Sequence, residues 1–257
     1  MAFVQRNKTS LYYEVHGGSG PTVLLAHGVG GNHASWFHQI RALSGDCRLI
    51  VFDARGFGNS DDVEMLGRSG FVDDIGAVLD DAKADRAVLV GQSMGGGACL
   101  SFTCAHPERV RGLVLADTLM GFVLPDSIRA FMAELTQRAA GWSQLERVLG
   151  KTTLARNPDM ALLYTQLASF NRVNIRTLKG TQRDHRPEEL GETGVPTLFL
   201  VGDEDALFPP QAVEAVQRLV KGSLYRVIKE AGHSAYFEQP AVFNQMLSDW
   251  LATLPPG

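Results

Sequence analysis

The sequence predicts an α/β fold: a mostly parallel sheet of eight strands, flanked by helices on both faces, with a helical lid. Short apolar runs rich in Val and Leu alternate with amphipathic segments of helical length, as in βαβ units. One long interval between two strand-like runs carries helical patterns instead. The chain has 257 residues, 45% of them hydrophobic and 20% charged, which suits one large domain with a sizeable core.

The predicted elements begin with a hairpin, over residues 3–5 and 11–16, followed by a buried strand over 22–27. Further strands are expected where apolar runs are bounded by turn residues, and helices where apolar residues recur at helical spacing. The predicted strands are 49–52, 87–91, 110–116, 197–201 and 224–228, and the helices are 71–84, 94–105, 211–220 and 241–254.

The interval 118–190 is predicted to be a helical unit. Apolar residues recur at helical spacing from Ile128 to Leu135, and Asn157-Pro158 is typical of a helix start, with Asn as the cap. Ordinary peripheral helices would give the same pattern, so a lid is the functional interpretation of it. The chain is accordingly divided into a core domain, residues 1–117 and 191–257, and a helical lid, residues 118–190.

Composition narrows the class of protein. There are 24 Lys and Arg against 28 Asp and Glu, a net charge of −4, and no basic run of the kind that binds nucleic acid. The three cysteines, Cys47, Cys99 and Cys104, lack C-x-x-C spacing, so neither a disulfide framework nor a zinc site is expected. Residues 1–10 do not resemble a signal peptide, and no apolar run is long enough to span a bilayer. We expect a cytoplasmic monomer or homodimer with no nucleic-acid or membrane partner.

A candidate nucleophile lies in the run GQSMG at residues 91–95, which matches G-x-S-x-G. The motif follows a predicted strand and precedes a predicted helix, so Ser93 would sit on a sharp, strained turn. Glycines on both sides of Ser93 would remove Cβ atoms that clash across such a turn, and the Met94 amide could stabilise an oxyanion. The alternative is a glycine-rich packing turn in which Ser93 only caps the helix.

A serine nucleophile needs a base, and His233 has the most suitable setting among the seven histidines. It lies just after the last predicted strand and before the last predicted helix. Because carboxyl ends of parallel strands meet at one edge of a sheet, His233 is expected close to Ser93.

The histidine needs a carboxylate to orient it, and Asp205, in the loop after the strand 197–201, fits this role. The resulting chain order, Ser, Asp, His, is the one expected for this motif. Asp203 and Glu204 in the same loop could cap the turn or face water. Asp117, at the end of the strand 110–116, is a second place from which a carboxylate could reach the base.

A second glycine-rich turn, HGVGG at residues 27–31, follows the strand 22–27. A dinucleotide loop would need glycine at position 33, where His33 stands, so nucleotide binding is disfavoured. We expect Val29 to provide a second oxyanion amide and His27 to hold the turn. Surface or packing roles are expected for the remaining histidines, with neither metal nor cofactor: His16, His33, His38, His106 and His185.

With these motifs in place, the sequence resembles the α/β-hydrolase superfamily across essentially its whole length. The segment DARGFGNS at 53–60 is similar to the family's D-x-R-G-x-G-x-S loop, and residues 106–110 are similar to the family's H-P-E-R-V segment. The resemblance is to the small-lid branch, which includes carboxylesterases, enol-lactonases, acyl-homoserine lactone lactonases, cofactor-free haloperoxidases and carbon-carbon bond hydrolases. Serine at position 93, where dehalogenases and epoxide hydrolases have aspartate, implies an acyl-enzyme.

The resemblance implies a serine hydrolase that cleaves a small-molecule carboxylic ester or lactone. Two other readings stay open: carbon-carbon cleavage or perhydrolysis on the same scaffold, and a non-catalytic receptor with the hydrolase fold. Apart from Arg55, assigned to the structural loop 53–60, no basic residue adjoins the catalytic loops in sequence, which favours a neutral substrate with a short or medium acyl chain. The expected pocket residues are Trp36, Phe122, Met132, Leu167, Phe208 and Tyr236.

Overall fold

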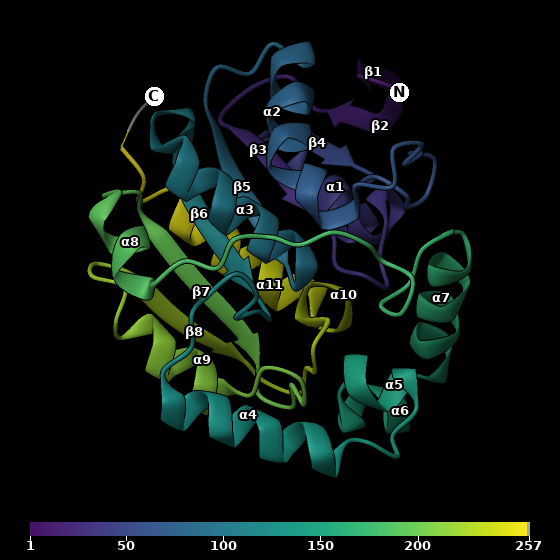
Figure 1. The fold of residues 1–257 in the computed structure, drawn as a ribbon, viewed down its shortest axis with the longest axis vertical. Coiled ribbons are helices and arrows are strands. Elements are labelled where there is room, and N and C mark those ends of the chain that lie inside the picture. Colours follow the sequence, from purple (N-terminus) through teal and green to yellow (C-terminus); the bar gives the residue numbers. More distant parts are fainter. Residues whose placement is uncertain (256–257) are drawn as a thin grey trace.

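A computed structural model, which describes residues 1–255, contains one eight-stranded sheet in the order β1-β2-β4-β3-β5-β6-β7-β8 (Figure 1). The strands are β1 (Ala2–Arg6), β2 (Thr9–His16), β3 (Thr22–Ala26), β4 (Arg48–Phe52), β5 (Ala87–Gln92), β6 (Val110–Ala116), β7 (Thr197–Gly202) and β8 (Leu224–Ile228). The first two pairings, β1 with β2 and β2 with β4, are antiparallel, and the pairings from β4 to β8 are parallel. The predicted mostly parallel sheet is confirmed.

Helices cover both faces of the sheet. Alternate residues of each inner strand enter two separate cores, as Leu24 and Val23 of β3 illustrate. One core contains α2 (Phe71–Asp81), α3 (Met94–Ala105) and α9 (Pro210–Gln217). The other contains α1 (Phe37–Leu43), α10 (Ala235–Glu238) and α11 (Pro240–Leu251). Three short 3-10 helices lie next to these helices along the chain. They are η1 (His33–Trp36) before α1, η2 (Gly67–Gly70) before α2, and η3 (Pro107–Arg109) after α3.

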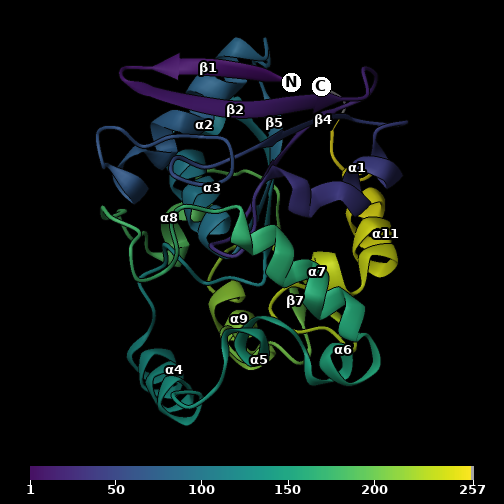
Figure 2. The same cartoon turned by 90° about the vertical axis from the view of Figure 1, so that its right-hand side faces the viewer.

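The segment 118–190, here called the helical insertion, lies between β6 and β7. It contains α4 (Asp126–Arg138), α5 (Gln144–Val148), α6 (Lys151–Arg156), α7 (Pro158–Ser169) and the start of α8 (Pro187–Glu192). Figure 2 shows α4, α5 and α6 at the end of the molecule opposite the β1–β2 hairpin. The side chain of Asn157 caps α7 by accepting a hydrogen bond from the Met160 amide.

Several element boundaries differ from the sequence prediction. Helices η1 and α1 were not predicted, and a reciprocal capping box of Asn32 and Ser35 starts η1. The last predicted helix, 241–254, corresponds to α11, which begins at Pro240 and ends at Leu251, and α10 is a short helix before it that was not predicted. The boundary expected at residue 190 falls inside α8, which packs against α3 of the core. Within residues 1–255, no helix is both long and apolar enough to cross a membrane.

Candidate active site

Ser93 occupies a strained turn between β5 and α3. Its backbone has φ 50° and ψ −116°, a conformation unfavourable for a residue with a Cβ. A Cβ on Gly91 would lie 2.5 Å from the Cα of Gly96, and one on Gly95 would collide with the carbonyl of Ala26. The chain therefore needs glycine at both positions to raise Ser93 above the sheet edge.

Ser93, His233 and Asp205 form a continuous hydrogen-bonded chain. The Nε2 of His233 lies 2.9 Å from Ser93 Oγ, and its Nδ1 lies 3.0 Å from Asp205 Oδ2. The second carboxylate oxygen of Asp205 accepts hydrogen bonds from the amides of Leu207 (2.8 Å) and Phe208 (2.9 Å). Asp205 is thus fixed by its own loop and orients the imidazole toward the serine.

The carboxylates around His233 shift its pKa upward. Burial acts to lower the pKa of His233, but the negative charges of Asp205, Asp117 and Glu238 outweigh burial and raise the pKa above its ordinary value. A base with a raised pKa accepts a proton from serine more readily, and nearby carboxylates stabilise the resulting imidazolium.

Asp117, the second acid that could have oriented His233, binds backbone amides instead. Asp117 is fully buried; its Oδ1 accepts from the Gly202 amide (2.8 Å) and its Oδ2 from the Ala235 amide (3.0 Å). Burial, and then repulsion from Asp205, raise the pKa of Asp117 well above its ordinary value. Through its two hydrogen bonds, the Asp117 side chain links the end of β7 to the segment that carries His233.

The two remaining acids of the Asp205 loop do not face the reaction centre. Asp203 accepts a hydrogen bond from the Glu230 amide (2.8 Å), as a turn-capping residue would. Glu204 binds the helical insertion instead, accepting from the amide (2.8 Å) and the hydroxyl (2.6 Å) of Thr152. The expectation that Glu204 only caps the turn or faces water was therefore wrong.

The glycine-rich turn 27–31 lies directly against the nucleophile. A Cβ on Gly28 would lie 3.0 Å from the Cβ of Ser93 and would collide with the side-chain oxygen of Gln92. Gln92 in turn donates from Nε2 to the carbonyl of His233 at 2.6 Å. Val29 follows Gly28 on this turn and Met94 opens α3, so both expected oxyanion amides belong to segments that flank Ser93.

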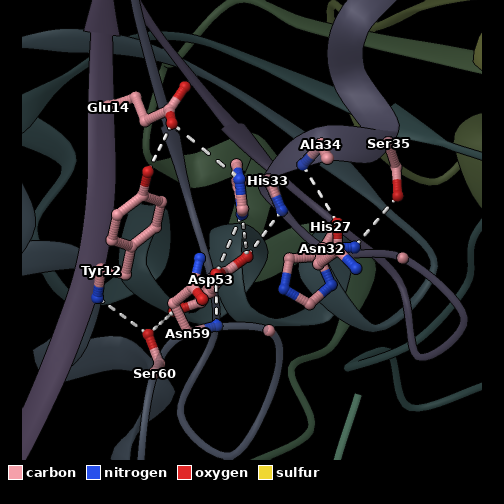
Figure 3. Close-up of polar contacts among 12 residues, drawn as sticks. Tyr12, Glu14, His27, Asn32, His33, Ala34, Ser35, Asp53, Asn59 and Ser60 are labelled. Carbon is pink, nitrogen blue, oxygen red and sulfur yellow. Dashed lines mark hydrogen bonds and ion pairs between the residues drawn. The ribbon is translucent and has the colours of Figure 1, made fainter. Parts of the chain in front are cut away.

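A network of polar side chains holds the turn 27–31 in place (Figure 3). The carboxylate of Asp53 accepts from the backbone amide (2.6 Å) and the Nδ1 (2.8 Å) of His33, and from the Asn59 amide (2.8 Å). Glu14 lies 3.9 Å from His33 Nε2 and accepts from the Tyr12 hydroxyl at 2.5 Å. His33 thus joins the turn to β2 and β4, a role that the sequence interpretation of it as a surface or packing residue missed.

The ionisation of this network follows from its contacts. Burial acts to lower the pKa of His33, but Asp53 and Glu14 outweigh burial and raise it. Burial acts to raise the pKa of Asp53, but hydrogen bonds and charge from His33 hold it below its ordinary value. His27 is different: burial lowers its pKa, its Nδ1 donates to the Gly28 carbonyl (2.7 Å), and its Nε2 accepts from the Ala54 amide (3.0 Å). Neutral His27 therefore holds the turn by hydrogen bonds.

The residues expected to line the pocket divide into two groups. Trp36 (0% exposed) and Tyr236 (1%) pack against each other in one core with their rings tilted by 38°, and Phe122 (5%) stacks on Phe199 in the other. Their contacts are those of core residues, and the expectation that they line the pocket stays a prediction. The other three are half-buried: Met132, Leu167, and Phe208, whose ring centroid lies 5.7 Å from that of His233.

Three basic residues near the catalytic loops lie beside acids, and one of them, Lys229, lies at the start of the segment that carries His233 and pairs with Asp203 at 3.3 Å, which the sequence interpretation overlooked. Arg55 is buried and forms a bidentate ion pair with Asp74, at 2.6 and 2.5 Å, in keeping with a structural role. The fold also brings Lys151 within 4.0 Å of Glu204, a proximity that sequence adjacency could not reveal. A cavity of about 450 Å³ lies at the far end of α3 and has no triad residue in its lining.

Comparison with known proteins identifies the family. A model of the alpha/beta hydrolase fold matches residues 21–240. The putative carbamate hydrolase RutD of Variovorax paradoxus is 31% identical, covering 96% of this chain and 98% of that protein. Carboxylesterase YbfK of Bacillus subtilis is 29% identical, covering 90% and 80%. A solved thermophilic esterase from Thermogutta terrifontis has a TM-score of 0.82 and 27% identity, covering 98% and 97%. The chain therefore belongs to the α/β-hydrolase family, and it is a hydrolase.

Proposed function

We propose that the protein is a serine hydrolase that cleaves a carboxylic ester or lactone through an acyl-enzyme on Ser93. The observation that carries this proposal is the unbroken hydrogen-bonded chain from Ser93 Oγ through His233 to Asp205. The strained backbone of Ser93 supports it, because strain of this kind is maintained where a nucleophile must be exposed at the sheet edge. The esterase relatives support ester cleavage in particular.

In the first half-reaction, Ser93 Oγ attacks the carbonyl carbon while His233 Nε2 accepts the hydroxyl proton. The amides of Val29 and Met94 bind the oxyanion of the tetrahedral intermediate. Each such donor typically contributes about 10²- to 10³-fold to the rate. The imidazolium of His233 then protonates the departing alkoxide oxygen, which leaves as an alcohol or, for a lactone, as the free hydroxyl end of the acyl chain.

In the second half-reaction, water attacks the acyl-enzyme. His233 removes a proton from the water, the same two amides bind the second oxyanion, and the proton returns to Ser93 Oγ as the acid leaves. Asp205 keeps the imidazole in the required tautomer throughout. No cofactor is needed for this chemistry.

We propose that the helical insertion acts as a lid and supplies part of an acyl pocket. Leu167 and Met132, on α7 and α4, are half-buried apolar residues of the insertion, and Phe208 lies beside the base. The carboxylates near His233 disfavour an anionic substrate, because like charges repel at short range in a buried site. A neutral ester or lactone with a short or medium acyl chain fits these properties.

Hydrolysis of p-nitrophenyl esters of increasing acyl length tests the proposed substrate class. Because each buried methylene contributes about 0.8 kcal/mol, kcat/KM should rise up to about fourfold per added carbon until the pocket is full. Acyl-homoserine lactones, an aryl carbamate and a dienol keto acid complete the panel. A decline in kcat/KM from acetate onward, or a strong preference for the keto acid, would contradict the apolar acyl pocket and favour carbon-carbon cleavage.

Substitution of the nucleophile tests the mechanism itself. Ser93→Ala should fold normally and lose more than about 10⁴-fold in kcat, because no acyl-enzyme can form. A fluorophosphonate probe should label the wild-type protein at Ser93 and leave the variant unlabelled. Turnover in the variant above about a hundredth of the wild-type rate would exclude Ser93 as the nucleophile.

A further inference from the structure

Glu238, the last residue of α10, is a buried acid that the mechanism above does not use. Its side chain is surrounded by the core and only 8% of the residue is exposed. The Oε1 atom accepts hydrogen bonds from the amides of Gly232 (2.8 Å) and Ser234 (3.2 Å), the two neighbours of His233. One carboxylate oxygen thus holds the backbone on both sides of the base.

The other oxygen of Glu238 binds the helical insertion. Oε2 accepts from the amide of Gly150 at 2.7 Å, and Gly150 is the N-cap of α6. The two backbones are in direct contact here. A Cβ on Gly232 would collide with the Gly150 nitrogen and lie 2.6 Å from the carbonyl carbon of Leu149. The start of α6 therefore packs against residues 229–234, here called the histidine loop, and Glu238 binds both segments.

A second acid fastens the same end of α6. Glu204, next to Asp205, binds the amide and hydroxyl of Thr152, two residues after Gly150. The start of α6 is therefore bound by one carboxylate beside the catalytic acid and by another beside the base. Glu204 contacts the segment that carries His233 through its backbone amide, which donates to the Ala231 carbonyl at 2.8 Å, whereas Glu238 contacts that segment with its carboxylate.

The carboxylate of Glu238 also acts on the base by its charge; burial raises the pKa of this acid, and its three amide hydrogen bonds act in the opposite direction. Three carboxylates influence the His233 imidazole: Asp205 after β7, Asp117 after β6, and Glu238 on α10. All three raise the pKa of His233 against the effect of burial. The imidazolium that forms when Ser93 attacks is therefore stabilised partly by Glu238.

We propose that Glu238 is a positioning residue that couples docking of the helical insertion to the placement and charge stabilisation of His233. When α6 is seated, the carboxylate is held by all three amides and fixes the backbone around the base. When α6 lifts, Glu238 loses its Gly150 contact, and the histidine loop loses the support of the α6 backbone packed against it. The inference rests on the proposed function, since it concerns the base of that reaction.

The test compares Glu238→Gln with Glu230→Gln. The control removes another carboxylate that links the histidine loop to α6, but this one pairs with Arg156 at the surface, where its side chain is 54% exposed. Glutamine at position 238 has one acceptor oxygen for three amides and no charge. We expect kcat for p-nitrophenyl butyrate to fall about 10- to 100-fold in Glu238→Gln, because slight misplacement of a catalytic group is costly. The control should stay within about twofold.

The pH profile provides a readout that a merely structural role would not move. Without the Glu238 charge the pKa of His233 falls, so the acid limb of kcat/KM should move about 0.5 unit or more to lower pH. Gly150→Ala keeps the charge but adds a Cβ only 2.8 Å from the Gly232 nitrogen, which should displace α6. This variant should lose about tenfold in kcat with the acid limb unmoved.

Several outcomes would overturn the inference. One is a Glu238→Gln variant with the kcat and acid limb of Glu230→Gln, and another is a fall in kcat with no shift of the limb. If Glu238→Gln does not fold, judged by circular dichroism, Gly150→Ala decides the question, and an unchanged kcat in that variant rejects the coupling. Fluorophosphonate labelling of wild-type Ser93 separates this failure from failure of the proposed function, which would leave the wild type unlabelled and inactive.

Discussion

The two sides of Ser93 are held in place by different chemistry. On the oxyanion side, the turn 27–31 is supported by imidazoles that alternate with carboxylates, principally His27, His33 and Asp53 (Figure 3). On the base side, the support consists of carboxylates that accept backbone hydrogen bonds, namely Asp117 and Glu238. The charged and ionisable groups that support the oxyanion side include imidazoles, whereas those that support the base side are carboxylic acids, aided by the neutral amide of Gln92.

The difference matches the charge that each side must stabilise. The base side surrounds one imidazole with acids, which favours the positive charge that His233 gains during the reaction. On the oxyanion side, the charge of His33 is balanced by Asp53, and His27 is neutral. The negative charge that develops there is left to oriented backbone amides.

The helical insertion is attached to the two sides in correspondingly different ways. On the oxyanion side it is held by neutral amides: Asn171 donates to the Gly31 carbonyl at 2.9 Å, and Asn32 donates to the Leu167 carbonyl at 2.9 Å. On the base side it is held by Glu204 and Glu238. Hydrogen bonds to charged groups are the stronger kind, so we expect the base side to be the firmer attachment.

The largest expected effect separates two acids within the base side. Asp205→Asn would place an amide against Nδ1 of His233 and favour the wrong tautomer, so kcat should fall by about 10⁴-fold. Asp117→Asn would instead leave one of two backbone amides without an acceptor, which should cost about 1–3 kcal/mol of unfolding free energy but less than about tenfold in kcat. Steady-state kinetics and urea unfolding of both variants measure these effects. If Asp117→Asn were the inactive variant, the orienting role would belong to Asp117.

On the oxyanion side we expect a smaller effect, a contribution of His33 to the free energy of unfolding that depends on pH. His33 has a raised pKa in the folded protein, so its charged contact with Asp53 is fully present below its ordinary pKa of 6.5 and is lost as the pH rises through the folded value. His33→Asn keeps a neutral donor that does not titrate. The wild type should be more stable than this variant by about 1–3 kcal/mol near pH 6, and the difference should shrink toward pH 9.

Urea unfolding at several pH values measures this difference. His106→Asn, at a half-exposed histidine outside the network, is the matched control and should change stability by less than about 0.5 kcal/mol. A stability difference for His33→Asn that stays constant from pH 6 to 9 would mean that the His33 charge contributes nothing, and the contrast between the two sides would then be one of geometry alone.

The same two sides show what the sequence could predict. The sheet and most of its helices follow local patterns, since residues such as Val23 and Leu24 alternate between two cores. The nucleophile and base were marked by glycine-rich motifs next to predicted strands. Glu238 and His33 lie in no such motif, because their roles depend on distant residues. Glu238 binds Gly150, 88 positions away, and His33 binds Asp53, 20 positions away. A single acid in the apolar run 235–238, directly before Pro240, was the available signal for Glu238.

The smallest expected effect tests the neutral attachment of the helical insertion. Asn171 also accepts from the Gly58 amide at 3.1 Å and from Asn32 Nδ2 at 3.3 Å, so Asn171→Ala removes contacts to Gly31, Gly58 and Asn32. Neutral hydrogen bonds contribute about 0.5–1.5 kcal/mol each, and the carboxylate attachments on the base side remain. We therefore expect about a threefold rise in KM for p-nitrophenyl butyrate, with kcat within about twofold of wild type. Asn174→Ala, at an exposed position in the same loop, is the control and should match the wild type. A loss of kcat in Asn171→Ala as large as that in Glu238→Gln would show that both attachments are equally coupled to catalysis, and the proposed asymmetry between the two sides would be wrong.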